Sequence, residues 1–196
     1  MHQACFRRQQ MLKESLEQFV APVYGKTKRS KDTYKTVAAH CRNHLVALVA
    51  EYNSVQNDQQ LLREIRNDMD YYIRRYHEYC IQQRDGMRAH YHEVGADEDC
   101  DFEHLIPASR IRDLLIAGVI TVEQALNAPT VVLSRAKHMA LKDAGWASKT
   151  PDMWHPFKRY SQVFTAKYIT HDGTPIDPGT WTLEDHFNRF AHLVIE

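Results

Sequence analysis

The spacing of apolar residues changes at Gly86, and this change limits the fold more than any other feature of the sequence. Before Gly86, apolar residues recur three or four positions apart, which is typical of amphipathic helices that bury one face. After Gly86, apolar runs are short and separated by turn-forming residues, which favours short strands and short helices. We therefore expect a helical N-terminal part followed by a mixed part.

The helical part contains three predicted segments. They cover residues 4–20, about 32–57 with Asp32 or Thr33 as the N-cap, and about 58–84. Pro22 and Gly25 end the first of them. Because the connecting loops are short and polar, the three segments indicate a helical bundle or platform.

The mixed part alternates short strands with short helices. Strands are predicted at residues 89–94, 101–106, 130–133 and 163–170, and helices at 108–118, 121–127 and 135–144, the last with Gly145 beyond its end. A final helix starts at Trp181, with Thr182 as N-cap and Asp185 at the capping-box position.

These patterns indicate one mainly α chain of the α+β class. We divide it into a helical platform at residues 1–87, a functional core at 88–160, and a strand-plus-helix extension at 161–196 that packs on the core. A chain of 196 residues is long enough for one compact domain with a helical extension.

Overall charge does not indicate a partner, because 25 Lys and Arg balance 25 Asp and Glu. Residues 1–90 hold 15 basic and 10 acidic side chains, whereas residues 91–196 hold 10 and 15. This polarity is compatible with a basic platform that carries an acidic site. It is equally compatible with a solvated helix surface that happens to be basic.

The four cysteines, at positions 5, 41, 80 and 100, form no CxxC pair. Their spacing argues against a zinc ribbon and against a disulfide framework, so reduced thiols are expected. The sequence has neither an apolar run long enough to span a membrane nor a signal-peptide core. We expect a soluble, cytoplasmic protein without a membrane partner.

The stretch DFEHLIPAS, residues 101–109, places an acid and an imidazole side by side in a short apolar strand. Adjacent strand residues point to opposite faces, so Glu103 and His104 can act on one bond only where the strand ends. Pro107 predicts such an end. Hydrolysis of a phosphodiester needs a base that works near neutral pH and a divalent cation at the scissile phosphate. The alternative is a half-exposed strand with two unrelated polar side chains.

Together with VVLSRAKHMALK, this stretch resembles the HNH family of ββα-metal nucleases over about residues 88–145. The first strand of that family carries an acid-His pair followed by apolar residues and proline. Its second half commonly reads L-C-x-x-C-H-x-x-K, and Leu133 to His138 keeps the Leu-to-His spacing, with Ser134 and Lys137 where zinc-ribbon members have cysteines. The HNH domain of RNA-guided CRISPR nucleases is similar and also lacks the cysteines.

The resemblance implies a role for each matching residue. His104 would be the general base, Glu103 and His138 would bind the metal, and Asn127 would orient the loop and the His104 backbone through its side-chain amide. Asp101 lies on the same strand face as Glu103 and is the alternative ligand. Mg²⁺ is the favoured ion, with Mn²⁺ or Zn²⁺ as alternatives.

Two departures from the family pattern affect these roles. Glu103 stands where Asp is commoner, and Asn127 lies two residues further from His138 than is usual. A helix C-cap is the simpler interpretation of Asn127. His90 and His92 have the spacing of two ligands on one strand face, but such a pair is more often an exposed face.

Affinity for a nucleic acid comes mainly from phosphate contacts. The predicted contacts near the site are Arg110, Arg112, Arg135, Lys137 and Lys142. A basic loop between the first two helices adds Lys28, Arg29 and Lys31, although a solvated turn explains that loop equally well.

We therefore expect a metal-dependent HNH-type endonuclease that hydrolyses phosphodiester bonds, with double-stranded DNA favoured over RNA as substrate. The N-terminal helices would hold substrate, a second copy of the chain or another protein. A phage-encoded, mobile-element, restriction or defence enzyme would fit. The alternatives are a toxin-type nuclease that acts on RNA or chromosomal DNA, and a non-catalytic nucleic-acid-binding or assembly protein on a degenerate ββα scaffold.

Overall fold

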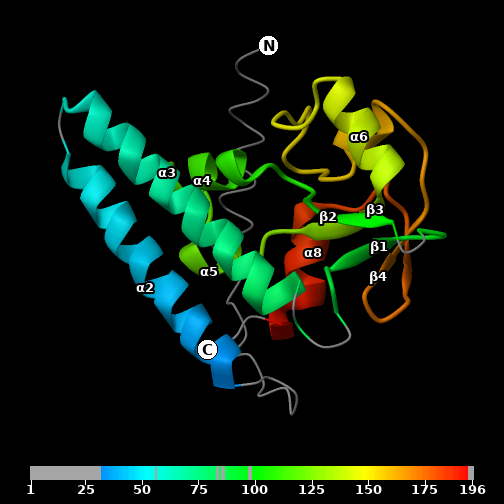
Figure 1. Ribbon diagram of the computed structural model, residues 1–196, viewed down its shortest axis with the longest axis horizontal. Coiled ribbons are helices and arrows are strands. Elements are labelled where there is room, and N and C mark those ends of the chain that lie inside the picture. Colours follow the sequence, from blue (N-terminus) through cyan, green and yellow to red (C-terminus); the bar gives the residue numbers. More distant parts are fainter. Residues whose placement is uncertain (1–31, 56, 83, 85–86, 97–98, 194–196) are drawn as a thin grey trace.

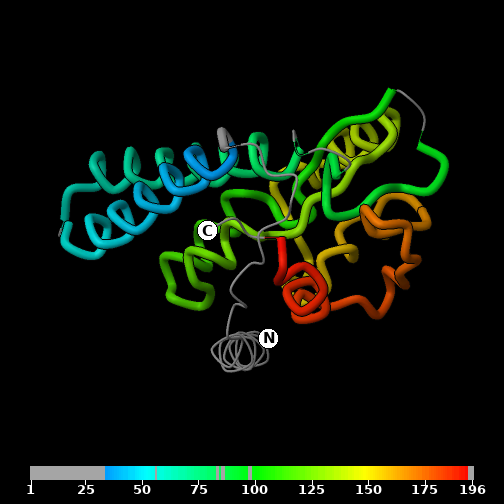
Figure 2. The backbone as a smooth tube through the Cα atoms, turned by 90° about the horizontal axis from the view of Figure 1, so that it is seen from below, coloured from blue at the N-terminus to red at the C-terminus, as the bar shows by residue number. Residues whose placement is uncertain are grey.

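A computed structural model describes residues 32–55, 57–82, 84, 87–96 and 99–193. The first predicted helix and the basic residues Lys28, Arg29 and Lys31 lie outside this part of the chain. The described residues form an α+β fold in which a long helical hairpin projects from one side of a small sheet (Figure 1, Figure 2).

The hairpin consists of α2 (Asp32–Ser54) and α3 (Gln59–Tyr76), which pack side by side along their length. Asp58 caps α3 by accepting a hydrogen bond from Leu61 N at 2.9 Å. The buried side chains of α3 recur at helical spacing, at Ile65, Met69, Ile73 and Tyr76, so one face contacts the core and the other faces solvent. The two predicted helices in this region are thus confirmed.

A π-helix, η1 (His77–Gln82), continues α3 without a break. Its buried residues are His77, Cys80 and Ile81. A π-helical turn is rare and often lies at a functional position, because the wider turn redirects side chains relative to the preceding α-helix. Here it directs the imidazole of His77 into the interior, toward the sheet.

Five short strands form one sheet in the order β2-β3-β1-β4-β5. The strands are β1 (Tyr91–Glu93), β2 (Cys100–His104), β3 (Thr130–Ser134), β4 (Tyr168–Thr170) and β5 (Pro175–Ile176). Strands β1 and β3 are parallel, and every other neighbouring pair is antiparallel. The first three predicted strands are confirmed, whereas the fourth is shorter than predicted because residues 163–167 form no strand.

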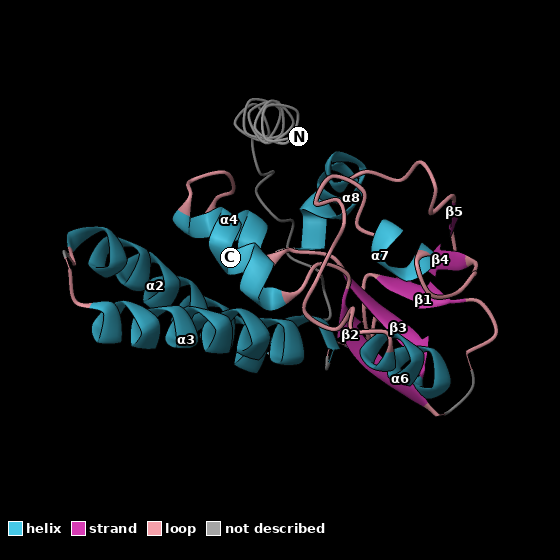
Figure 3. Ribbon diagram, turned by 90° about the horizontal axis from the view of Figure 1, so that it is seen from above, coloured by secondary structure: helices cyan, strands magenta, loops and turns pink. Residues whose placement is uncertain are grey.

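Strand β2 pairs antiparallel with β3, and β3 is followed directly by α6 (Arg135–Asp143), so these three elements form a ββα arrangement in space. Between β2 and β3, Glu103 pairs with Val131 and His104 with Thr130. The long connection between the two strands contains α4 (Ala108–Ile116) and α5 (Val122–Leu126). Figure 3 shows α6 beside β2 and β3, and α4 against the helical hairpin.

The C-terminal segment completes the sheet and covers it. After the short α7 (Lys158–Ser161) and strands β4 and β5 come α8 (Leu183–Phe190) and a 3₁₀ turn, η2 (Ala191–Leu193). Thr182 and Asp185 form the predicted capping box, with Thr182 Oγ1 accepting from Asp185 N at 3.1 Å.

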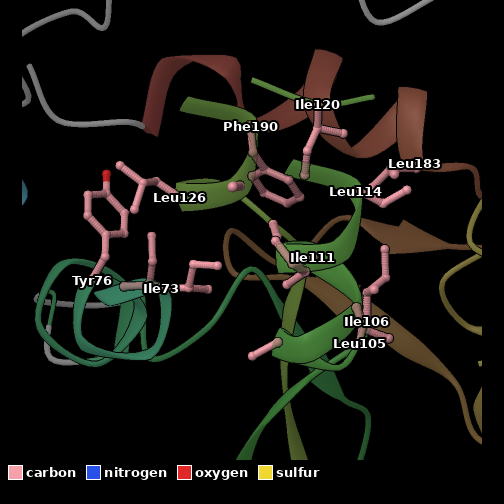
Figure 4. Packing of buried hydrophobic residues seen from close by; sticks show 14 of the residues in the cluster. Ile73, Tyr76, Leu105, Ile106, Ile111, Leu114, Ile120, Leu126, Leu183 and Phe190 are labelled. Carbon is pink, nitrogen blue, oxygen red and sulfur yellow. The ribbon is translucent and has the colours of Figure 1, made fainter. Parts of the chain in front are cut away.

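One hydrophobic cluster joins the hairpin, the ββα arrangement and the C-terminal segment. It contains Ile73 and Tyr76 of α3, Leu105 after β2, Ile111 of α4 and Phe190 of α8 (Figure 4). The cluster therefore includes residues from all three predicted parts of the chain. No helix of the described chain has both the length and the apolar character needed to cross a membrane.

Candidate functional site

The strand pair β2–β3 and the helix α6 bring two carboxylates of β2 to one imidazole of α6. Because Asp101 and Glu103 are two positions apart on a strand, they share a face, and that face is turned toward α6. Nδ1 of His138 lies 2.9 Å from Oδ2 of Asp101, and Nε2 of the same ring lies 3.5 Å from Oε2 of Glu103. The three side chains predicted as metal ligands are thus adjacent, at 16–31 % side-chain exposure.

The position of α6 depends on a buried carboxylate of the parallel neighbour strand. Glu93 of β1, whose side chain is 5 % exposed, accepts hydrogen bonds from the backbone and hydroxyl of Ser134, where α6 begins, and pairs with Lys137. Burial alone would raise the pKa of Glu93, but these hydrogen bonds outweigh burial and lower it. At the other end, Gly145 adopts a φ of +74° and donates to Lys142 O, which ends α6 as predicted.

Arg159 is a further residue of the site, and the sequence did not reveal it. Its guanidinium is fully buried, with Nη2 paired to Oε1 of Glu103 and Nη1 donating to the carbonyl of His104 at 3.0 Å. Arg159 lies 56 positions from Glu103, in the segment MWHPFKRY. No spacing rule links positions so far apart.

His104 points away from the two carboxylates. It is the last residue of β2, it is 9 % exposed, and its Nε2 lies 2.8 Å from Nδ1 of His77. His77 Nε2 in turn donates to the carbonyl of Leu126 at 2.9 Å. As expected for adjacent strand residues, the side chains of Glu103 and His104 thus lie on opposite faces of β2.

Burial favours the neutral form of both imidazoles of this pair. Burial lowers the pKa of His77 to about 4 and the pKa of His104 well below its ordinary value. The positive charge of Arg74 acts on both rings in the same direction. In the described part of the chain, Nε2 of His104 has a hydrogen-bond partner and Nδ1 has none.

Asn127 lies at the end of α5, as the C-cap interpretation expected, and is 1 % exposed. Its side-chain Oδ1 accepts from Nε2 of His90 at 3.1 Å, and its Nδ2 donates to the carbonyl of Phe190 at 3.2 Å. Its backbone carbonyl accepts from Nε2 of His186 at 2.6 Å. The amide therefore joins the end of α5 to His90 and α8, whereas the carbonyl of His104 accepts from Arg159.

His90 and His92 do not share a site. His90 is fully buried and lies 2.8 Å from the hydroxyl of Thr130, whereas His92 lies 2.8 Å from the carbonyl of Met87. Both ring nitrogens of His90 and Nε2 of His92 are engaged in these hydrogen bonds, and neither ring lies next to His138 in any contact of the described chain.

The predicted phosphate contacts fall into three groups. Arg112 is 10 % exposed and paired to Asp70 at 2.8 Å, so it joins α4 to α3 and does not face solvent. Arg135 lies at the site itself, 3.6 Å from Asp101, whereas Lys137 is paired with Glu93 of β1. Arg110 and Lys142 are exposed.

Within the described ranges, no group of three or more His, Cys, Asp or Glu side chains has the geometry of an assembled metal site. The chain matches no family model, no curated protein and no solved structure. The described residues form an α+β fold that contains a ββα arrangement and a cluster of two carboxylates and one imidazole.

Proposed function

We propose that the protein is a metal-dependent endonuclease of the HNH type that hydrolyses phosphodiester bonds of DNA. The observation that carries the proposal is the convergence of Asp101, Glu103 and His138 on one face of the ββα arrangement. Two carboxylates and an imidazole, partly open to solvent, are suitable donors for a divalent cation that also binds phosphate.

Glu103 and His138 are the proposed metal ligands, and Asp101 orients His138. Neighbouring ligands of an octahedral ion with bonds of about 2.1 Å lie about 3 Å apart. The 3.5 Å between Nε2 of His138 and Oε2 of Glu103 is close to that separation. Asp101 holds the other ring nitrogen at 2.9 Å, in the way that carboxylates commonly orient metal-binding histidines.

The site has few protein donors, which fits Mg²⁺ or Mn²⁺ better than Zn²⁺, because hard cations keep water and phosphate oxygens as ligands. When bound, the cation would neutralise charge on the scissile phosphate and on the leaving oxygen. The nearby cations Arg135 and Lys137 would attract the phosphate backbone, and Lys142 and Arg110 would extend that contact along the surface.

His104 is the proposed general base. A neutral imidazole can accept a proton from water through the ring nitrogen that carries no hydrogen, and Nδ1 of His104, which has no hydrogen-bond partner in the described chain, is the atom available for this step. Because burial lowers the pKa of this ring, it is a weaker base than an exposed imidazole. Because β2 ends at His104, the ring and the Glu103 carboxylate lie on the two sides of the strand terminus.

Two measurements test the proposal. Plasmid DNA and RNA are incubated with the protein, with Mg²⁺ or Mn²⁺ and with EDTA, and Mn²⁺ binding is followed by calorimetry. We expect cation-dependent DNA cleavage that His104→Ala abolishes, and an Mn²⁺ Kd that Glu103→Gln raises about 10-fold or more. Asp143→Asn, which removes an exposed carboxylate at the end of the same helix α6, is the matched control and should change neither result.

Cleavage that persists in EDTA or in His104→Ala would refute the assignment. Preferential cleavage of RNA would favour the toxin-type alternative. Thermal unfolding of each variant must accompany the assays, because Glu103 also pairs with the buried Arg159.

One observation favours the non-catalytic alternative. The site carboxylates already have cationic partners within the chain, since Glu103 is paired with Arg159 and Asp101 lies 3.6 Å from Arg135. A degenerate ββα scaffold that binds nucleic acid without cutting it would have such internal neutralisation. It would bind DNA without cleaving it, and Mn²⁺ binding would be the same in Glu103→Gln as in the unsubstituted protein.

A further inference from the structure

The two buried imidazoles of His77 and His104 come from different elements and touch through one hydrogen bond. His77 belongs to the π-helix η1, and His104 ends β2. Their ring centroids are 4.9 Å apart, and Nδ1 of His77 lies 2.8 Å from Nε2 of His104. Such a contact specifies which nitrogen of each ring carries the proton, because two imidazoles can share one hydrogen bond only as donor and acceptor.

The direction of this bond follows from the carbonyl of Leu126. A carbonyl oxygen can only accept, so Nε2 of His77, 2.9 Å away, must carry a hydrogen. A neutral His77 has then no hydrogen on Nδ1, and this nitrogen accepts from Nε2 of His104. A neutral His104 that donates through Nε2 keeps its lone pair on Nδ1.

We propose that His77 is the positioning residue of the catalytic base, and that it holds His104 in the Nε2–H tautomer so that the lone pair lies on Nδ1. The proposal rests on the proposed function, because it concerns the same base. In other sites a carboxylate or a backbone carbonyl fixes the tautomer of a catalytic histidine. Here the two successive hydrogen bonds, from His77 to the carbonyl of Leu126 and from His104 to His77, would have this role.

The surroundings of the pair exclude other ways of fixing the tautomer. The charged groups that lower the pKa of His104 are Arg74 of α3 and Arg159 of α7, and both are cations that donate but do not accept. Within the described residues, Nε2 of His104 therefore has one hydrogen-bond acceptor, which is Nδ1 of His77. Without it, the polar hydrogen of a buried ring would be unpaired, and the other tautomer would become competitive.

The first test measures the tautomer directly. Protein labelled with ¹⁵N in its histidines is studied by long-range ¹H–¹⁵N NMR at neutral pH and without metal, and His104→Ala identifies the signals. We expect Nε2 of His104 to be protonated and Nδ1 unprotonated. His77→Phe should shift His104 toward a mixture of tautomers. His77→Asn should preserve the original one, because Oδ1 of Asn is attached to Cγ as Nδ1 of His is.

His186→Phe is the matched control for this measurement. His186 is also fully buried and also donates through Nε2 to a backbone carbonyl, that of Asn127, but it does not touch His104. It should lower stability to a similar degree as His77→Phe while leaving the ¹⁵N shifts of His104 in place. A tautomer of His104 with Nδ1 protonated, or one that His77→Phe leaves unchanged, would overturn the proposal.

The second test separates this proposal from the proposed function. If the protein cleaves plasmid DNA, we expect His77→Phe to lower kcat about 10-fold or more with KM within about twofold, and His77→Asn to recover most of the loss. An equal kcat in His77→Phe would refute the positioning role. If the unsubstituted protein does not cleave, the proposed function fails, and with it the role of His77 in cleavage, whereas the NMR result still decides the tautomer.

Discussion

At the scale of single residues, Arg159 shows how far the site depends on a contact between distant parts of the chain. Its guanidinium contacts both the side chain of Glu103 and the backbone carbonyl of His104, and so it holds both members of the acid–His pair in place. Lysine could not replace it, because one ammonium group lacks the fork geometry needed for two such contacts.

Replacing Arg159 by Met should therefore lower the free energy of unfolding by about 3 kcal/mol, because Glu103 would lose its partner while remaining 16 % exposed. Urea denaturation measures this loss. The adjacent residue provides the control, since Lys158 is 41 % exposed and pairs with Asp152 at 2.9 Å. Lys158→Met should cost less, about 1 kcal/mol, because Asp152, although only 9 % exposed, keeps its contacts to Trp154 N at 2.9 Å and to Nδ1 of His155 at 3.0 Å. Equal losses in the two variants would contradict the role assigned to Arg159.

At the scale of elements, ion pairs fix the helical hairpin to the helices between β2 and β3. Arg112 of α4 reaches Asp70 of α3, and Arg66 of α3 lies 2.8 Å from Asp113 of α4. Further along, Arg42 of α2 lies 2.6 Å from Glu123 of α5. These pairs keep α3 in register with the sheet, and hence keep His77 opposite His104.

Arg112→Leu should remove about 2–4 kcal/mol of stability, because the partly buried Asp70 would be left without its cation. Arg110→Leu on the same helix is the comparison, since Arg110 is exposed and lies 3.5 Å from Asp113. Its cost should be below about 1 kcal/mol. Thermal or urea unfolding distinguishes the two, and a large loss in Arg110→Leu alone would be inconsistent with the structure.

The elements themselves could largely be predicted from the sequence, and the contacts among them only in part. Periodicity and capping residues gave α3 and α8 because those signals are local. The approach of Asp101 to His138 followed from strand alternation together with a known sequence pattern. The pairing of His104 with His77 could not be predicted, because it depends on the packing of η1 against β2 and on a π-helical turn for which the sequence has no local marker. The parallel pairing of β1 with β3 was likewise beyond local patterns.

At the scale of the whole molecule, buried neutral histidines make stability depend on pH. His77, His90 and His186 are fully buried, and burial lowers their pKa values, to about 4 for His77 and about 3 for His186. In the unfolded chain these rings titrate near pH 6.5. Because the folded pKa is the lower one, the stabilisation is complete above about pH 6.5 and is lost as the pH falls toward the folded pKa.

Between about pH 6.5 and pH 4, these three rings should therefore bind up to three more protons in the unfolded state than in the folded state, and His104, whose pKa burial also lowers, adds to the difference. Each ring should lower the free energy of unfolding by up to about 1.4 kcal/mol per pH unit. Urea unfolding at pH 7, 6 and 5 measures the slope, and His186→Phe should reduce it by the contribution of one ring. Stability that is constant over this range would show that the rings are protonated or exposed in the folded state.

The central place of β3 in the sheet has a consequence for attempts to miniaturise this protein. Because β3 is hydrogen-bonded to β2 along one edge and to β1 along the other, residues 100–143 do not include all the strands that pair with β3. An excised fragment would keep the helix that carries His138 but would lose Glu93, Arg159 and His77, and it would offer a bare strand edge to other molecules. The chemistry proposed here therefore belongs to the assembled chain and cannot be transplanted with its signature segment alone.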